Sequence, residues 1–408
     1  MELDVKSWLT DHSGEATLLG ICPMSESIVE AALREAAAED GFVPMFIATP
    51  RQVDADRGYT GWSQSELVAF VEETADDVGY DGPTILARDH GGPYQSTRDR
   101  GDPNVPLEVA MEYAMELFEE DVESGFDLLH VDATEDATID GVLDLEEIVR
   151  RTTDLLVEIE TFRSEGEYPP VYYEVGTEEI AGGMTESDDF EAFIELLRES
   201  LEERGYGAVM DRILFVVGQV GTTMQIDMQN QFDPAKTREL VEIVSAHDCY
   251  LKVHYTDWLD DAELERFPEL GIGAANVGPE FAAAIVEAHE ELESIEREVV
   301  DDAESLSNFN EVLQDAAVRD APWKKFAPTG LEADDLTDFA DQNSRNIAVC
   351  VGRYVLNDDA VADARRTLYE NLEAADAVDD PDAFVVQSVR ETIHRYAVAF
   401  GRQDGGTR

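Results

Sequence analysis

Eight short apolar runs, each followed by a longer amphipathic segment, constrain the fold of this chain more than any other feature of its sequence. The runs span residues 18–24, 43–48, 84–87, 128–131, 171–175, 213–217, 250–254 and 272–277. Strands buried on both faces read as continuous apolar runs, and their alternation with helices is typical of a parallel sheet. Eight such units within roughly 280 residues match the size of a closed barrel. The sequence therefore predicts an α/β fold, a TIM (β/α)8 barrel.

The segments between the runs repeat their apolar residues with the period of an α-helix. They span residues 28–39, 63–78, 106–122, 145–162, 188–204, 233–246 and 258–267. An open, doubly wound sheet is the alternative, but it would favour a glycine-rich turn after the first strand, and Cys22-Pro23-Met24-Ser25 is no such turn. After Gly278 the pattern is mostly helical, beginning with residues 281–300. We therefore predict a barrel over residues 1–295 and a helical C-terminal extension over residues 296–408, packed on the barrel.

The charge of the chain is strongly negative, with 92 Asp and Glu against 29 Lys and Arg and a formal net charge of -63. The acidic residues lie on the polar faces of many predicted helices, for example at Glu72, Glu73, Asp76 and Asp77, and are not collected in a tail. Such a surface repels itself in dilute buffer, whereas the screening length shortens to ~3 Å in molar salt. We therefore expect a protein of a haloarchaeon-like halophile with a high-salt cytosol. Nucleic acid is an unfavourable partner because its phosphates would be repelled.

Cysteine usage and hydropathy also favour a cytoplasmic protein. Cys22, Cys249 and Cys350 are widely spaced and form no disulfide framework. No apolar run reaches the length of a membrane span, and no basic region precedes an apolar one at the N-terminus. We expect no contact with a membrane.

Polar residues concentrate directly after the predicted strands, the positions that converge on the face where barrel enzymes carry out their chemistry. His90, Glu178 and His254 follow the third, fifth and seventh strands and offer nitrogen and oxygen ligands for a divalent metal with an open position for substrate. A lone histidine is more often a satisfied core residue, but an Asp-His pair, a glutamate and a histidine at three strand ends favour a site. Glu174, within the fifth strand, is the second choice after Glu178, as a deeper ligand or a buried partner.

Two further groups of polar residues leave alternatives open. His130 and Asp132 share one face of the fourth strand, and they could act at the barrel mouth or form a buried polar pair. The Gly278-Pro279 turn opens the helix after the eighth strand, where barrels often hold a phosphate, although a plain capping turn explains it as well. Lys324 and Lys325 stand out in a chain so poor in cations, and they could meet an anion or form a solvated surface pair.

A series of short motifs resembles the D-tagatose-1,6-bisphosphate aldolase accessory subunit family, the Z-type, "non-catalytic" partner of a class II aldolase. The motifs occur in the same order and at similar spacing, and they cover the barrel and, weakly, the extension. They are Gln52-Val53-Asp54, Gly58-Tyr59-Thr60-Gly61, Asp89-His90 with Gly92-Pro93, His130 with Asp132, Gly176-Thr177-Glu178 with Gly182-Gly183, Gln219 with Gly221, Pro234-Ala235-Lys236, His254 with Thr256-Asp257, and Val277-Gly278-Pro279.

The resemblance implies a TIM barrel related to class II aldolases, which use Zn²⁺ to polarise a ketose carbonyl and to stabilise an enediolate. Asp89-His90 resembles the pair that supplies a base and a metal ligand in those enzymes, and His130 or Asp132 would be a second acid–base group. The ion would be Zn²⁺, with Mn²⁺ or Co²⁺ as alternatives. The residues expected to contact substrate are Gln52, Tyr59, Thr60, Gln219, Asp257, Asn276 and Gly278.

Two departures from the family pattern concern the charge of the substrate. Asn276 and Glu280 stand where the family has a lysine and a small residue, and Val349-Cys350-Val351-Gly352 precedes Arg353-Tyr354 where the family usually has Ser-Asp-Arg. A carboxylate at a helix N-terminus competes with a bound anion, so these changes favour an unphosphorylated or singly charged sugar over a bisphosphate.

Three functions remain open from the sequence. The first is a metal-dependent aldolase acting on a ketose or ketose phosphate, and the second is a ketose 4-epimerase that uses retro-aldol chemistry at the same metal. The third is a non-catalytic subunit that supports a separate class II aldolase chain. We also expect a homo-oligomer.

Overall fold

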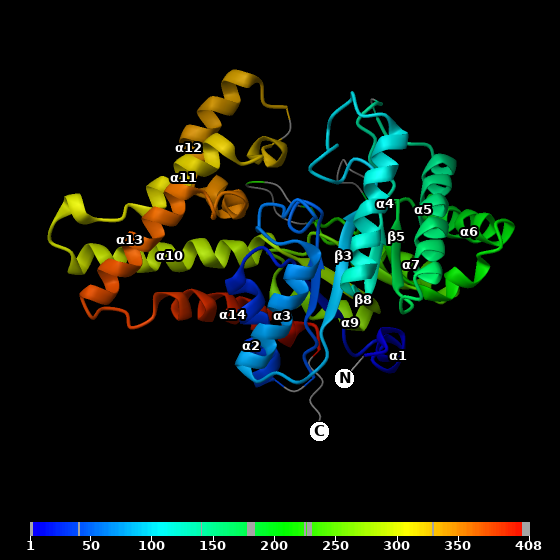
Figure 1. Cartoon of the computed structure of the whole chain (residues 1–408), viewed down its shortest axis with the longest axis horizontal. Helices are drawn as coiled ribbons and strands as arrows, with labels where there is room; N and C mark the ends of the chain where they lie inside the picture. Colours follow the sequence, from blue (N-terminus) through cyan, green and yellow to red (C-terminus); the bar gives the residue numbers. More distant parts are fainter. Residues whose placement is uncertain are drawn as a thin grey trace.

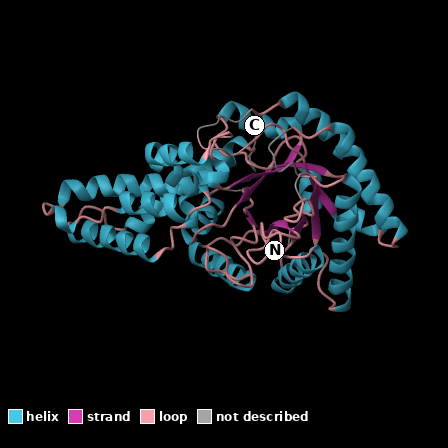
Figure 2. Cartoon of the chain, turned by 90° about the horizontal axis from the view of Figure 1, so that it is seen from above, coloured by secondary structure: helices cyan, strands magenta, loops and turns pink. Residues whose placement is uncertain are grey.

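The eight predicted strands are present and close into a parallel barrel in sequence order, with β8 beside β1 (Figure 2). The computed structural model describes residues 3–39, 41–139, 141–177, 184–223, 226, 231–328 and 330–401. The strands are β1 Leu18–Ile21, β2 Met45–Ala48, β3 Ile85–Gly91, β4 Leu128–Val131, β5 Tyr172–Gly176, β6 Ile213–Val217, β7 Tyr250–Val253 and β8 Ile272–Val277. The predicted TIM barrel is confirmed.

Helices surround the barrel as predicted, with one exception. The surrounding elements are α2 Glu26–Ala38, α3 Gln64–Val78, α4 Leu107–Ser124, α5 Leu145–Glu165, α6 Ser187–Glu203, η1 Gly207–Arg212, α7 Pro234–Ala246 and α10 Pro279–Val299. The single helix predicted over residues 258–267 is instead two short helices, α8 Asp261–Leu264 and α9 Arg266–Leu270. The break has a local cause, because Pro268 lacks the N–H that would bond the carbonyl of Leu264, and its ring would clash with that carbonyl.

Helix α1, Val5–Asp11, covers the end of the barrel where the strands begin, which leaves the other end for a site. It lies below the barrel in Figure 1. Val5 and Leu9 belong to the same apolar cluster as the strand residues Leu18, Met45 and Ile85, which lie near the start of β1, β2 and β3. The opposite end, where the strands finish, is the mouth of the barrel.

The C-terminal extension is helical and contacts the loops at the mouth. It contains η2 Ala303–Ser305, α11 Phe309–Asp320, η3 Trp323–Phe326, α12 Ala333–Val351, η4 Gly352–Tyr354, α13 Asp359–Ala374 and α14 Pro381–Ala399. Helix α10 runs without interruption through the predicted boundary at residue 295, and α14 returns to pack against α2 and α10 (Figure 1). Hydrogen bonds join the extension to the mouth, and two of them involve the loops after β2 and β6. The Ile226 amide donates to the Phe326 carbonyl at 2.7 Å, and the Asn357 side chain donates to the Tyr59 carbonyl at 3.3 Å.

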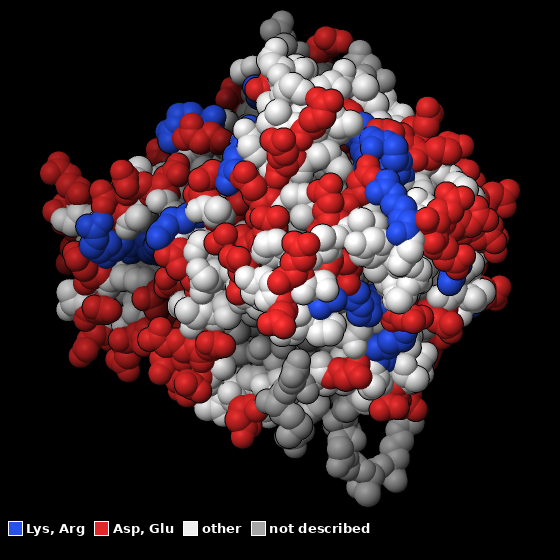
Figure 3. All heavy atoms as spheres, turned by 45° about the vertical axis from the view of Figure 1, so that its right-hand side comes forward, with Lys and Arg blue, Asp and Glu red and all other residues white. Residues whose placement is uncertain are grey.

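Acidic side chains cover much of the face drawn in Figure 3, with small groups of Lys and Arg between them. This distribution agrees with the spread of acidic residues along the sequence. Among the described residues, no helix is long and apolar enough to cross a bilayer.

A buried ion pair anchors the loop that follows β2. Arg88, in β3, is fully buried, and its Nε and Nη2 atoms donate to Asp121 on α4 at 2.8 and 2.5 Å. Its Nη1 atom donates to the carbonyls of Ala48 and Val53 at 2.8 and 2.9 Å. Arg88 therefore fixes both ends of the segment that carries Gln52.

Replacing Asp121 by alanine is expected to lower the free energy of unfolding by about 3–5 kcal/mol, because it leaves the Arg88 guanidinium buried without its counter-charge. The double variant Arg88→Met with Asp121→Leu should recover part of this loss, but not all, since two carbonyls then lack a donor. Urea unfolding in high KCl measures both. A single variant as stable as the unmodified chain would contradict the expectation.

Candidate active site at the barrel mouth

A β-bulge at the end of β3 brings two neighbouring side chains to the mouth. Between Arg88 and Gly91 the register with β4 shifts, and His90 adopts a left-handed backbone conformation with φ 52°. In a regular strand Asp89 and His90 would point to opposite faces, whereas a bulge re-aims the side chains beside it. Gly92 follows in very close contact with β4, since a Cβ atom there would lie 1.7 Å from the Asp132 carbonyl oxygen.

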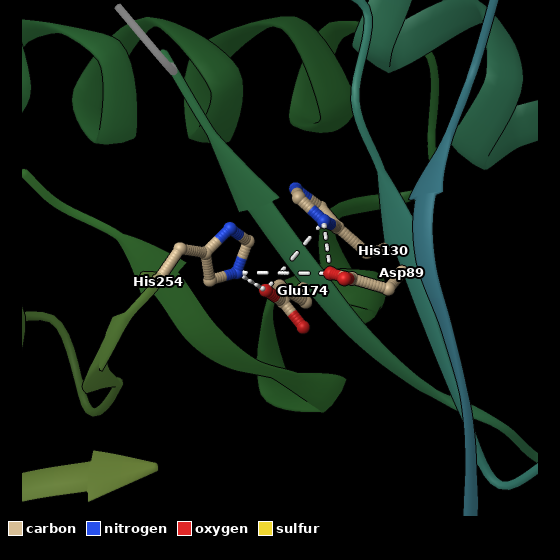
Figure 4. Close-up of side chains that lie close together, drawn as sticks. All are labelled: Asp89, His130, Glu174 and His254. Atoms are coloured by element: carbon tan, nitrogen blue, oxygen red, sulfur yellow. Dashed lines mark hydrogen bonds and ion pairs between the residues drawn. The ribbon is translucent and has the colours of Figure 1, made fainter. Parts of the chain in front are cut away.

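Four buried side chains from four strands converge at the mouth (Figure 4). They are Asp89 from β3, His130 from β4, Glu174 from β5 and His254, directly after β7, and we call them the quartet. The Nδ1 atom of His130 lies 3.6 Å from Asp89 Oδ1 and 3.6 Å from Glu174 Oε1. The Nε2 atom of His254 lies 3.8 Å from Asp89 Oδ1 and 3.1 Å from Glu174 Oε1. His130 and Glu174 are direct neighbours across the β4–β5 ladder, which explains their proximity.

The two carboxylates of the quartet are held in their charged form. Burial alone would raise the pKa of Glu174, but Lys252, His130 and His254 lower it to about 2. Burial likewise opposes ionisation of Asp89, yet the neighbouring His90 and His254 bring its pKa well below the usual range. Both groups are therefore anionic at neutral pH.

Lys252 is a further candidate residue of this site that the sequence did not single out. It is fully buried in β7, and its Nζ atom donates to Glu174 Oε2 at 2.5 Å, so that Glu174 Oε1 faces the histidines. The available signal was a lysine within an apolar strand run, two residues before His254 and hence on the same face.

His90 and Asp132 form a second polar pair beside the quartet. His90 Nδ1 lies 2.8 Å from Asp132 Oδ2, and the imidazole of His90 is centred 5.0 Å from that of His254. Asp132 also accepts hydrogen bonds from Gln95 Nε2 and from the amide and hydroxyl of Thr134, at 2.9, 3.1 and 2.5 Å. The His90 side chain is 19% exposed, whereas those of the quartet are 0–6% exposed, so His90 is the group that a ligand would meet first.

His130 is buried and hydrogen-bonded on one side only. Its Nδ1 atom accepts a hydrogen bond from the His90 amide at 3.1 Å, and its Nε2 atom has no hydrogen-bond partner among the described residues. Asp132 pairs with His90 and not with His130. The alternative that His130 and Asp132 form a buried polar pair with each other therefore does not describe these contacts.

Asn276 lies against the quartet, as the sequence predicts for a residue that contacts substrate. Its Nδ2 atom donates to Asp89 Oδ1 at 3.2 Å, while its Oδ1 atom is buried without a hydrogen-bond partner in the described part of the chain. Gly20 makes room for this side chain, since a Cβ atom on Gly20 would lie 2.5 Å from Asn276 Oδ1.

Four other residues predicted to contact substrate make contacts outside the quartet. Gln52 and Thr60 fold their loop, because the Thr60 hydroxyl donates to the Gln52 carbonyl at 2.6 Å and Gln52 Oε1 accepts from the Thr49 amide at 2.9 Å. Tyr59 makes an edge contact with Tyr354 of the extension, with ring centres 4.9 Å apart. Gln219 exchanges hydrogen bonds with Thr185 through its backbone. Glu178 lies outside the described residues.

The turn after β8 is filled by a carboxylate of the chain itself. Asp257 Oδ1 accepts hydrogen bonds from the amides of Gly278 and Glu280, at 3.0 and 2.8 Å, and Asp257 is 3% exposed. Burial, followed by the charge of Glu280, raises the pKa of Asp257 to about 7. Glu280 accepts a hydrogen bond from the Trp258 amide at 2.5 Å and forms an ion pair with Arg395 at 2.8 Å. Its charge is therefore compensated, whereas the sequence analysis treated it as a free carboxylate.

The chain matches one family model over residues 8–400, described as D-tagatose-1,6-bisphosphate aldolase subunit GatZ/KbaZ-like. A structure named "probable tagatose 6 phosphate kinase" from Sinorhizobium meliloti 1021 is similar at a TM-score of 0.76 and 20% identity, covering 94% of this chain and 100% of that one. Fructose-bisphosphate aldolase from Campylobacter jejuni is similar at 0.55 and 12% identity, covering 97% and 92%. Fructuronate-tagaturonate epimerase from Cohnella laeviribosi is similar at 0.54 and 11% identity, covering 96% and 82%.

The three structures share the fold with this chain, and at such low sequence identities the similarity indicates the fold alone. The family match spans almost the whole chain and agrees with the motifs found in the sequence. The chain belongs to the D-tagatose-1,6-bisphosphate aldolase subunit GatZ/KbaZ-like family.

Proposed function

We propose that this chain is a metal-dependent enzyme that acts on a ketose or ketose phosphate by aldol-type chemistry at the quartet. The observation that carries the proposal is the spacing of four donor atoms at 3.1–3.8 Å along the four pairs described above. A tetrahedral ion with bonds of about 2.0–2.1 Å separates its ligands by roughly 3.3–3.4 Å. These four separations are close to those of a zinc site, and all four donor atoms lie within 4.8 Å of one another. Mn²⁺ and Co²⁺ also accept imidazole and carboxylate ligands and are the alternatives.

The charges at the mouth support a divalent cation. Asp89, Asp132 and Glu174 contribute three negative charges, and Lys252 compensates one of them. With neutral imidazoles, two negative charges remain in a buried site, where uncompensated charge is costly. One divalent ion would neutralise them.

Asp89, Glu174 and His254 are the ligands that we assign first. His130 Nδ1 already accepts the His90 amide, so its coordination would require that hydrogen bond to give way. Three protein ligands with a remaining position are the usual arrangement of a catalytic zinc. Relative to the roles that the family resemblance implies, Asp89 becomes a ligand and His90 becomes the acid–base group.

A bound ion would supply the Lewis acid that polarises the ketose carbonyl. His90 is placed to move a proton at a substrate hydroxyl, since Asp132 fixes its ring and stabilises its charged form, as carboxylates commonly do for catalytic histidines. Removal of the C4 hydroxyl proton breaks the C3–C4 bond and leaves an aldehyde and an enediolate. Asn276, with its free Oδ1, is placed to accept a hydrogen bond from another substrate hydroxyl.

Two related functions follow from the same site. Re-addition of the enediolate to the other face of the aldehyde would make the chain a ketose 4-epimerase, and the similar fold of fructuronate-tagaturonate epimerase favours this second candidate. The family description names a subunit, so a non-catalytic chain that supports a separate class II aldolase is the remaining candidate.

The test is turnover by the purified chain alone, loaded with zinc in molar KCl. We expect ¹³C NMR to detect three-carbon fragments or the C4 epimer when D-tagatose 1,6-bisphosphate, D-fructose 6-phosphate and D-fructose are supplied in turn. Fragments identify an aldolase and epimer alone identifies an epimerase. If no ketose changes, while the chain raises the activity of a separate class II aldolase, the proposal of an enzyme is wrong and the chain is an accessory subunit.

A further inference from the structure

Two arginines lie over the ring of Tyr354, and a lysine lies over the nearby ring of Phe326, where the extension crosses the barrel mouth. Arg51, in the loop after β2, and Arg353, in η4, each place the guanidinium carbon 4.5 Å from the centre of this ring. Lys325, in η3, lies 4.9 Å from the ring of Phe326, and Arg353 lies over the same ring at 5.9 Å. We call Arg51, Lys325 and Arg353 the Tyr354 cluster.

The Tyr354 cluster has no acidic partner, although acidic residues outnumber basic ones by 92 to 29 in this chain. Within the described residues, none of its three side chains forms an ion pair with a carboxylate. Arg353 is 7% exposed and donates only to the Cys350 carbonyl and, at 3.3 Å, to the Tyr354 hydroxyl. A guanidinium taken out of water without a counter-charge is costly, which favours a bound anion beside it.

Two side chains report a positive potential at this place. Burial would raise the pKa of Tyr354, but Arg353, Arg51 and Lys325 stabilise its anion so strongly that the pKa is lowered. Burial and the repulsion of neighbouring arginines, partly offset by Tyr354, lower the pKa of Lys325 to about 8. The potential that favours a phenolate also favours the anionic group of a ligand.

The other obvious place for an anion is already taken. The amides at the start of α10, where barrels often hold a phosphate, donate to the Asp257 carboxylate. A phosphate at this turn would have to displace the buried Asp257 side chain from these two amides. Of these two places in the described part of the mouth, the Tyr354 cluster is therefore the one open to an anion.

The Tyr354 cluster and the quartet both lie at the barrel mouth. Arg51 follows β2, and the ring of Tyr59 in the same loop lies 4.9 Å from that of Tyr354. The quartet lies at the ends of β3, β4, β5 and β7. Charges of both sets act on the buried Cys22 thiol after β1, since Asp89 raises its pKa and Arg353 lowers it. Two groups at one mouth can hold the two ends of one ligand.

We propose that the Tyr354 cluster binds the single anionic group of the substrate, a phosphate or a carboxylate at the end of the ketose remote from its carbonyl. The inference rests on the proposed function, since it assigns the carbonyl end to the quartet. It makes the extension part of the substrate site, because Lys325 and Arg353 come from η3 and η4. It also limits the substrate to one strongly bound anionic end.

The experiment is calorimetric titration of the zinc-loaded full chain with D-fructose, D-fructose 6-phosphate, D-fructuronate and D-fructose 1,6-bisphosphate at one fixed ionic strength. We expect D-fructose to bind at least ~10-fold more weakly than the better of the two singly anionic ligands, since each charge-assisted contact is worth a factor of this order. Whichever of these two binds more tightly identifies phosphate or carboxylate. The bisphosphate should gain less than ~2-fold over the monophosphate.

Adjacent lysines give a matched pair of variants. Lys325→Met should weaken the binding of the anionic ligand by ~10-fold and leave D-fructose unchanged. Lys324→Met removes the same charge one residue away, outside the Tyr354 cluster, and should change neither by more than ~2-fold. Neither lysine side chain belongs to the apolar core, so both variants should fold, which circular dichroism checks.

Equal binding of D-fructose and the anionic ligands would overturn the inference, as would equal effects of the two lysine variants. Neither result depends on turnover. If the chain binds zinc and converts free ketoses without preferring an anionic one, this inference is wrong but the proposed function stands. If the chain binds the anion at Lys325 but holds no metal, the proposed function is wrong but this inference stands.

Discussion

Replacing His254 by alanine is expected to weaken zinc binding by at least ~100-fold and to abolish ketose turnover, while the barrel stays folded. Loss of a residue that merely orients a metal ligand typically costs 10–100-fold in affinity, so loss of a ligand should cost no less. The fold should persist because His254 lies at the end of a strand, away from the apolar core. Competition with a chelator and elemental analysis measure the affinity and the zinc content. His247→Ala is the control and should retain the metal, because His247 lies at the C-terminal end of α7, away from the mouth.

Matched pairs of variants separate the ligands that we propose from those predicted from the sequence. Glu174→Gln should lose zinc, whereas Glu178→Gln should keep it if Glu174 is the ligand. Asp89→Asn should lose zinc, whereas His90→Asn should keep it and lose turnover by ~10²–10⁴-fold, the usual contribution of an acid–base group. Full zinc occupancy in Glu174→Gln and Asp89→Asn would refute the assigned ligand set.

The thermal stability of the chain should rise steeply with salt. The formal charge is -63, and acidic side chains cover much of the face drawn in Figure 3. Screening shortens from ~10 Å at 0.1 M to ~3 Å at 1 M ionic strength. If each excess charge gains only ~0.1 kcal/mol from screening, the total is about 6 kcal/mol, which corresponds to a shift on the order of 10 °C in melting temperature.

Thermal melts across a KCl series measure this shift, and sucrose separates screening from preferential exclusion, since sucrose is excluded from the protein surface but carries no charge. A melting temperature that responds equally to sucrose and to KCl, or to neither, would contradict the account. A steep response to KCl alone would support the proposal that the protein works in a high-salt cytosol.

The sequence predicted the barrel well because burial on both faces leaves a continuous apolar run at each strand. All eight runs correspond to strands, and the polar residues that follow them do gather at one face. His254 was identified as a candidate ligand for this reason, and it lies in the quartet.

The detailed composition of the site depends on geometry that a sequence does not express. The bulge at His90 decides that Asp89 joins the quartet, and the Gly91-Gly92-Pro93 run that follows does not by itself show which side chain turns inward. Glu174 ranked behind Glu178 because its depth in the strand could not be judged without the β4–β5 register. The Tyr354 cluster joins residues about 270 and 300 positions apart in the chain, a contact that local patterns cannot predict.

The most direct test of the account is a crystal grown with zinc and measured on both sides of the zinc absorption edge. We predict one anomalous peak at the barrel mouth, within bonding distance of Asp89, Glu174 and His254. Absence of a peak at the mouth from a crystal whose zinc content is confirmed, or a peak bound there by other residues, would contradict the claim that these side chains form a catalytic metal centre.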